Sequence, residues 1–181
     1  MPSRWKLQGQ ALVLDCPIFQ VYAKQFEHPI DHRHGTFYTI EANDWVQVIA
    51  VTPEQQLILV KQFRFGTQEF SLEPPGGIMD TGEDPLHAAA RELREETGYV
   101  GHPGRELLSL SPNPAMMNNR LHIVLIEQCR RIDTQHLDPN EEITDTLVSP
   151  EDCRRYIAEG QINHGIAALS LLVYFFEKNG F

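Results

Sequence analysis

Three glutamates are spaced so that their side chains emerge together from one face of a helix. Glu92, Glu95 and Glu96 follow the pattern i, i+3, i+4 within residues 84–97, a segment with helical periodicity. Like charges at this spacing repel one another, and a hard divalent cation reverses that cost. Oxygen ligands with no neighbouring His or Cys favour Mg²⁺, with Mn²⁺ as a substitute. For these three residues alone, the alternative is a solvated acidic helix face.

Clear start and stop signals bound the helix that must hold these glutamates. Pro85 suits a first helical position, and Gly98 is typical of the residue just past a helix end. The apolar positions predict one buried stripe, formed by Leu86, Ala89, Ala90 and Leu93. Ahead of the helix, the pair Gly76-Gly77 lets backbone carbonyls approach a metal where side chains would obstruct.

The spacing around the glutamates resembles the complete signature of the Nudix hydrolases. It is filled at every specified position by Gly77, Glu83, Arg91-Glu92-Leu93, Glu95-Glu96 and Gly98-Tyr99. The resemblance implies an α/β (α+β layered) Nudix fold, with a mixed β-sheet core sandwiched between helices and an N-terminal β-strand extension. It further implies a metal site with a catalytic glutamate, Glu95, and with the ligands Gly76, Glu92, Glu95 and Glu96. Glu83 is expected to support the loop.

The residues before this signature resemble the ADP-ribose and nucleoside-diphosphate-sugar pyrophosphatase branch. Residues 61–64 and 72–77 carry the likeness, which implies that Arg64 meets phosphate and that Glu73 helps to bind substrate or metal. Pro74 departs from the aliphatic residue commoner in that branch, so the direction of Glu73 stays open. For Arg64, the alternative is a surface cation at a strand end.

Two later segments extend this likeness. Pro114 stands where the ADP-ribose branch carries a proline, which implies a substrate-binding role, although residues 111–115 depart from the Ser-Pro-Gly of strict ADP-ribose enzymes. That departure leaves room for other sugar nucleotides. Residues 138–143 resemble a late acidic loop that supplies a catalytic base or an extra metal ligand. Either Glu141 or Glu142 could be that residue, and a solvated acidic turn is the alternative.

The resemblance implies hydrolysis of the phosphoanhydride bond of nucleoside diphosphate sugars, of the ADP-ribose or GDP-mannose type, to a nucleoside monophosphate and a sugar phosphate. A second interpretation keeps the chemistry and changes the substrate to a nucleoside triphosphate, NADH or coenzyme A. A third is a non-catalytic ADP-ribose-binding module. Such modules usually lose the signature glutamates, whereas Glu92, Glu95 and Glu96 are all present here.

The overall composition and net charge limit the kinds of binding partner that the protein could have. The 181 residues carry 25 acidic against 15 basic side chains, a formal net charge of -10. That field repels nucleic acid and anionic bilayers, so we expect neither as a partner. No signal peptide or membrane-length apolar run is visible, and the three cysteines form no C-x-x-C pair. These features predict a cytoplasmic protein.

Short β-prone runs alternate with three helical segments. Strands are expected at residues 11–14, 18–22, 36–40, 46–51, 56–62, 106–110, 121–127 and 146–148. A break is expected at residues 74–77, and the later helices at about 150–160 and at 163–178.

We divide the chain into an N-terminal strand region, residues 1–42, and a Nudix hydrolase domain, residues 43–181. In the ADP-ribose and nucleoside-diphosphate-sugar pyrophosphatases that this sequence resembles, the N-terminal strands commonly cross to a partner subunit. The resemblance therefore implies a homodimer. The basic run His32-Arg33-His34 could then meet phosphate across the interface. A plain surface turn accounts for it equally well.

Overall fold

The computed structural model describes residues 1–179 and divides the chain into two compact units. The first unit comprises Met1–Asp44 and Ser111–Arg120, and the second Trp45–Leu110 and Leu121–Phe181. The division of the chain into an N-terminal strand region, residues 1–42, and a Nudix hydrolase domain, residues 43–181, stays a prediction.

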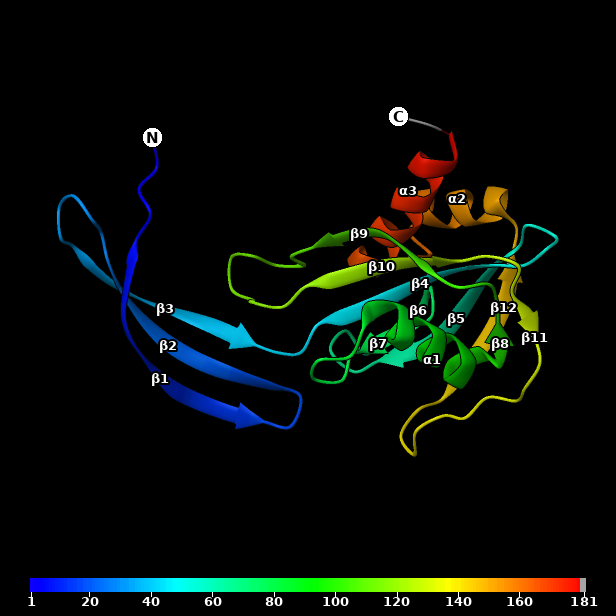
Figure 1. Cartoon of the computed structure of the whole chain (residues 1–181), viewed down its shortest axis with the longest axis horizontal. Helices are drawn as coiled ribbons and strands as arrows, with labels where there is room; N and C mark the ends of the chain where they lie inside the picture. The colour runs from blue at the N-terminus through cyan, green and yellow to red at the C-terminus, as the bar shows by residue number, and fades with distance from the viewer. Residues whose placement is uncertain (180–181) are drawn as a thin grey trace. The chain divides into compact units, whose positions relative to one another are not determined.

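The first unit is a three-stranded antiparallel sheet in the order β1-β2-β3 (Figure 1). Its strands are β1 (Lys6–Cys16), β2 (Phe19–Glu27) and β3 (His34–Glu41). They run well beyond the short apolar runs that signalled them, because polar residues continue the pairing at both ends. Within this unit, a bridge links Ile40 to Met117 of the 111–120 loop.

The second unit is built on a mixed sheet in the order β12-β5-β4-β10-β9. Its strands include β4 (Trp45–Val51), β5 (Leu57–Arg64), β9 (Arg105–Leu110), β10 (Leu121–Ile126) and β12 (Ile143–Val148). The central strand β4 pairs parallel with β10 along its length. Two further strands, β6 (Glu69–Glu73) and β7 (Gly76–Ile78), pair with β5 and β4. A small separate ladder joins β8 (Tyr99–Val100) to β11 (Arg130–Arg131).

Helices cover both faces of this sheet (Figure 1). Because side chains alternate along β4, Val46 and Val48 face the helix α1 (Pro85–Thr97), whereas Ile49 packs on the opposite side. That side is covered by α2 (Pro150–Ala158) and α3 (Gly165–Asn179). The expected α/β layered fold, a mixed sheet between helices, is therefore confirmed.

Two local expectations were wrong. Residues 74–77 do not simply break regular structure, since β7 begins at Gly76 and pairs with β4. The buried stripe of α1 is also turned from the one expected: Ala90 is exposed, and Ala88 is fully buried in its place. The helix packs on the sheet through the side that carries the small residues Ala88 and Ala89. Glu96 lies on the same side and is therefore buried with them.

The strand β5 also pairs differently from a simple hairpin. It meets β4 at two residues only and then pairs with β12 on one side and β6 on the other. Among the described residues, no helix is long and apolar enough to cross a membrane. A cytoplasmic location stays a prediction.

Candidate active site

The acidic helix has a cap at each end, and Gly98 at its C-terminus is the residue that its sequence indicated. The Asp84 carboxylate accepts hydrogen bonds from the backbone N–H groups of Leu86 and His87, at 2.9 and 3.2 Å, and so caps the N-terminus. At the other end Gly98 adopts φ 71°, and its N–H donates to the Arg94 carbonyl. The glutamates between these caps are thereby held at fixed positions along the loop and helix.

The glycine pair brings the preceding loop against this helix. A Cβ at Gly76 would lie 2.2 Å from the Val46 carbonyl oxygen, and one at Gly77 would lie 2.7 Å from Glu92 Oε1. The Gly76 N–H donates to Glu96 Oε2 at 2.9 Å. Gly76 requires glycine because the backbone approaches so closely, whereas at Gly77 only the flexible Glu92 carboxylate would have to move.

Arg91 binds three of the carboxylates of the signature. Its Nε and Nη2 each lie 3.0 Å from an oxygen of Glu83. Its Nη1 donates to Glu92 Oε1 at 2.9 Å and to Glu95 Oε2 at 3.0 Å. Glu83 also accepts the Asp80 N–H at 3.0 Å, so it ties the loop to the helix. This network orients Glu92 and Glu95 and screens part of their charge.

Glu96 is buried without a cationic partner of that kind. Burial, reinforced by the charges of Glu92 and Glu141, raises its pKa to about 8 against the opposing Gly76 hydrogen bond. Burial likewise raises the pKa of Glu92, although Arg91 opposes this shift. The charged forms of buried Glu96 and half-buried Glu92 are therefore disfavoured, and the charge of Glu141 adds to this effect on both. A cation is the partner that such a group lacks.

The donor chemistry fits a divalent ion, although a closed cage is not formed. Within residues 1–179 no three His, Cys, Asp or Glu side chains converge as ligands, because Glu92 and Glu95 turn to Arg91. Binding of an ion would draw these carboxylates away from the guanidinium. The oxygens of Glu92, Glu95, Glu96 and the Gly76 carbonyl are of the chemical kind that Mg²⁺ prefers, and their role as its ligands stays a prediction.

A second charged group lies on β5 and β6. Arg64 Nε and Nη2 lie 2.6 and 2.8 Å from the two carboxylate oxygens of Glu73, a residue that is 0% exposed. His164, next to α3, places Nδ1 2.7 Å from Glu73 Oε2, although the ring is not aligned for a linear hydrogen bond. Burial alone would raise the Glu73 pKa, but His164 and Arg64 outweigh it and hold the pKa at about 2.

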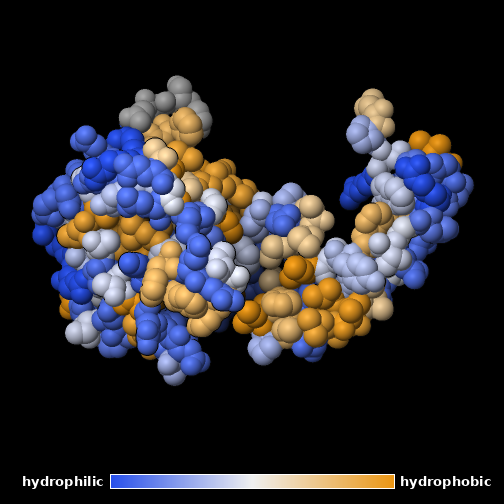
Figure 2. Space-filling view, turned by 180° about the vertical axis from the view of Figure 1, so that it is seen from behind, coloured by the Kyte–Doolittle hydropathy of each residue, from blue (hydrophilic) through white to orange (hydrophobic). Residues whose placement is uncertain are grey.

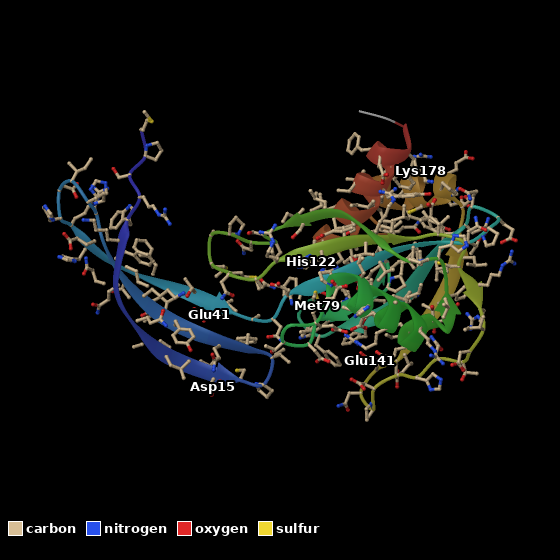
Figure 3. All side chains as sticks on the ribbon, in the orientation of Figure 1. Asp15, Glu41, Met79, His122, Glu141 and Lys178 are labelled. Atoms are coloured by element: carbon tan, nitrogen blue, oxygen red, sulfur yellow. The ribbon has the colours of Figure 1, made fainter. Side chains whose placement is uncertain are left out.

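These residues open onto a cleft of about 1220 Å³. Its walls come from the β5–β6 hairpin, the loop before β12 and the residues that precede α3. Its polar lining includes Arg64, Ser71, Glu141, Glu142, Asn163 and His164. The structure therefore brings together Arg64, Glu141 and Glu142, which lie far apart in sequence. Figure 3 labels Glu141 on the loop beside α1.

The two candidates on this loop differ in their electrostatic surroundings. Glu141 contributes to the pKa shifts of Arg64, Glu92 and Glu96. Its Oε2 accepts the Asp138 N–H at 3.1 Å. These facts favour Glu141 over Glu142 as the loop glutamate that faces the acidic helix.

Two other predictions concern the first unit. Pro114 lies in the loop 111–120 of that unit, so its role in substrate binding stays a prediction. The basic run is matched locally by acids: His32 contacts Glu27, and Arg33 donates to Asp31 at 2.8 Å. Its role in phosphate binding also stays a prediction.

Sequence patterns did not indicate His164 or Ser71 as residues of the cleft. His164 reads as the polar start of an apolar helix, and Ser71 as one residue in a strand. The proximity of His164 to Arg64 depends on how α3 docks on the sheet, which no local pattern encodes, whereas Ser71 is placed by the pairing of β6 with β5. Asn163 was missed for the same reason as His164.

Comparisons with known proteins place this architecture in a family. The model of the NUDIX domain matches residues 43–166. An ADP-ribose pyrophosphatase of Bacillus subtilis is 31% identical over 118 residues, which are 65% of this chain and 64% of that protein. An ADP-sugar pyrophosphatase of Mus musculus is 41% identical over 70 residues, 39% of this chain and 32% of that protein. The chain thus spans less than two thirds of the length of either relative.

The fold has a counterpart among solved structures. The crystal structure of an ADP compounds hydrolase superposes with a TM-score of 0.85, covering 98% of this chain and 96% of that one. At 19% identity this likeness shows the fold alone. A sheet between helices, with an acidic loop and helix against its central strand, defines the Nudix class of domain. Because the family model covers most of the chain, the protein belongs to the Nudix family, and the resemblance drawn from its sequence is confirmed.

Proposed function

We propose that this protein is a metal-dependent pyrophosphohydrolase of nucleoside diphosphate sugars. Water would cleave the phosphoanhydride bond of a substrate such as ADP-ribose or GDP-mannose, giving a nucleoside monophosphate and a sugar phosphate. The printed names of its relatives, an ADP-ribose pyrophosphatase and an ADP-sugar pyrophosphatase, support this substrate class. The activity fits the second unit, which carries the charged groups described above.

The observation that best supports the proposal is electrostatic. The carboxyls of Glu92 and Glu96 and the guanidinium of Arg64 are all influenced by Glu141 on the wall of the cleft. Glu96 and Glu92 are interior carboxyls with raised pKa values, and both are influenced by Glu141 on the wall of the cleft. Arg64 lies on that wall and also interacts with Glu96 and Glu141. A diphosphate chelated to a divalent cation matches this arrangement, since the cation meets the carboxylates and the phosphate meets the arginine.

The side chains divide the chemical work between them. The oxygens of Gly76, Glu92, Glu95 and Glu96 would hold Mg²⁺ or Mn²⁺, which when bound neutralises phosphate charge and polarises water. Arg64 orients the diphosphate through its free N–H groups. Glu73, fully buried, fixes the guanidinium from behind and keeps it from folding away.

A base is needed to accept the proton of the attacking water. Glu141 suits this role because it lines the cleft and its charge contributes to the raised pKa values of Glu92 and Glu96. As water attacks phosphorus, its proton passes to the Glu141 carboxylate and the anhydride P–O bond breaks. The second phosphate leaves as an anion beside Arg64.

Product analysis with Mg²⁺ tests the proposal. The panel should contain ADP-ribose, GDP-mannose, other sugar nucleotides, nucleoside triphosphates, NADH and coenzyme A. We expect a nucleoside monophosphate and a sugar phosphate from at least one sugar nucleotide. Cleavage confined to triphosphates, NADH or coenzyme A would keep the Nudix chemistry and overturn the substrate class. Binding of ADP-ribose without any turnover would indicate a binding module instead.

We also propose that the protein forms a homodimer through its N-terminal sheet. Leu12, Val13, Leu14 and Ile18, at the end of β1 and the turn into β2, are all exposed. Figure 2 shows apolar side chains gathered on this unit. An exposed apolar group of this kind is typical of an interaction surface. Sedimentation velocity should give twice the chain mass of 20.7 kDa, and Leu12→Glu/Leu14→Glu should give a monomer. A monomeric wild-type protein would contradict this proposal.

A further inference from the structure

His164 has a ring with two different surroundings. Its Nδ1 atom is buried and lies 2.7 Å from Glu73 Oε2, yet 35% of the side chain is exposed. The exposed part of the ring therefore belongs to the atoms away from Nδ1. Because His164 also lines the cleft, that part faces the same space as Arg64 and Glu141.

The backbone that carries His164 is anchored on both sides. Ile162 is buried in the core, and the N–H of Ala168 donates to the His164 carbonyl at the start of α3. The neighbouring Asn163 donates to Glu69 Oε2 of β6 at 3.3 Å. Two side-chain contacts thus join this segment to β6, which gives the imidazole a defined position relative to Arg64.

Glu73 determines which ring nitrogen carries hydrogen. A carboxylate is an acceptor without hydrogens, and two acceptors 2.7 Å apart would repel each other. Nδ1 must therefore be the protonated nitrogen. In the neutral ring, Nε2 is then left with a lone pair and can only accept a hydrogen bond. Ionised phosphate oxygens offer no hydrogen to such an atom, whereas a sugar hydroxyl does.

We propose that His164 is a substrate-binding residue whose Nε2 accepts a hydrogen bond from a sugar hydroxyl of the nucleotide in the cleft, with Glu73 fixing the ring from behind. This inference rests on the proposed function for its ligand. The Glu73 carboxylate would then position two substrate-binding residues at once. It contacts Arg64, which is proposed to bind phosphate, and His164, which is proposed to bind the sugar.

Binding of two non-hydrolysable ligands tests the contact independently of turnover. The first is α,β-methylene ADP-ribose, and the second is methylenediphosphonate, which has the same P–C–P bridge and no hydroxyl. His164→Asn keeps an N–H near the Nδ1 position and removes Nε2. We expect this variant to bind the sugar nucleotide about three- to tenfold more weakly in calorimetry with Mg²⁺, and to bind methylenediphosphonate as the wild type does. An equal loss for both ligands, or no loss for either, would overturn the proposal.

A spectroscopic measurement tests the tautomer without any ligand. Long-range ¹H–¹⁵N correlation spectra at pH 8 should show the His164 ring protonated at Nδ1, assigned by its disappearance in His164→Asn. In Glu73→Gln the ring should lose this preference. A wild-type ring protonated at Nε2 would contradict the inference, even if the enzyme hydrolyses sugar nucleotides. Conversely, the protein could fail to hydrolyse sugar nucleotides while His164→Asn weakens their binding and the ring is protonated at Nδ1. That result would contradict the proposed activity and leave the inference on His164 intact.

Discussion

Arg64 donates hydrogen bonds to both carboxylate oxygens of Glu73, with Nε 2.6 Å from Oε1 and Nη2 2.8 Å from Oε2. The carboxylate is fully buried, whereas the guanidinium reaches the wall of a cleft. The pair lies on two adjacent strands, since β5 and β6 are in register at Arg64 and Glu69 and at Val60 and Glu73. The phosphate contact proposed for Arg64 would therefore be built on paired strands.

Removing the arginine should damage the fold as well as the binding of substrate. Arg64→Ala leaves the Glu73 charge buried with only His164 beside it, so we expect a loss of about 2 kcal/mol in the free energy of unfolding, at the low end for buried pairs because Arg64 is partly exposed. Urea denaturation measures this loss. Arg64→Ala/Glu73→Gln should recover part of it, and equal stabilities of the single and double variants would contradict the role of the pair.

Acid should weaken the protein through Glu73. Because its folded pKa is about 2 and its ordinary value is 4.5, the ionised form stabilises the folded state. This contribution is complete above pH 4.5, is lost as the pH falls towards 2, and amounts to at most about 3 kcal/mol. Glu73→Gln should therefore flatten the dependence of unfolding free energy on pH between 4.5 and 2.5. An unchanged slope would place the acid sensitivity elsewhere.

Glu96 should give folding stability the opposite dependence on pH from Glu73. Its folded pKa, about 8, is raised, so without metal its ionisation destabilises the fold progressively as the pH rises from 4.5 to 8. Glu96→Gln should raise Tm most at pH 9, less at pH 6 and little at pH 4. Mg²⁺ should stabilise the wild type more at pH 8.5 than at pH 6, because proton and cation compete for the same oxygens. A metal-induced rise in Tm that persists in Glu96→Gln would remove this residue from the ligand set.

The loop glutamates should differ in their effect on turnover. Glu141→Gln is expected to lower kcat by about a hundredfold or more, since Glu141 lines the cleft and is the proposed base. Glu142→Gln serves as the matched control on the adjacent position and should retain kcat within about threefold. Steady-state kinetics with ADP-ribose measures both. The reverse ranking would assign the base to Glu142.

The glycine before the acidic helix should tolerate no side chain. Gly76→Ala places a Cβ 2.2 Å from the Val46 carbonyl oxygen at a residue with φ 156°, so the central strand must shift. We expect a loss of at least about 2 kcal/mol in unfolding free energy. Gly165→Ala is the control, because no atom lies within 4 Å of its Cβ, and its stability should stay within about 0.5 kcal/mol.

Local chemistry made the acidic helix predictable. Asp84, Pro85 and Gly98 act through their immediate neighbours, and the helix Pro85–Thr97 forms between them as expected. The face that it buries was not predictable, because packing on the sheet selected Ala88 over Ala90. The contact of His164 with Glu73 joins residues about ninety positions apart and depends on the docking of α3, so it had no sequence signal.

The most direct test of the account is the turnover of ADP-ribose by Glu96→Gln in saturating Mg²⁺. This side chain lies inside the acidic loop and helix, accepts the Gly76 N–H and has no packing role that glutamine would not fill. We predict a fall in kcat of about a thousandfold or more with the fold retained, whereas Glu151→Gln, an exposed control on α2, should match the wild type. Near-normal hydrolysis by Glu96→Gln would contradict the proposed metal site.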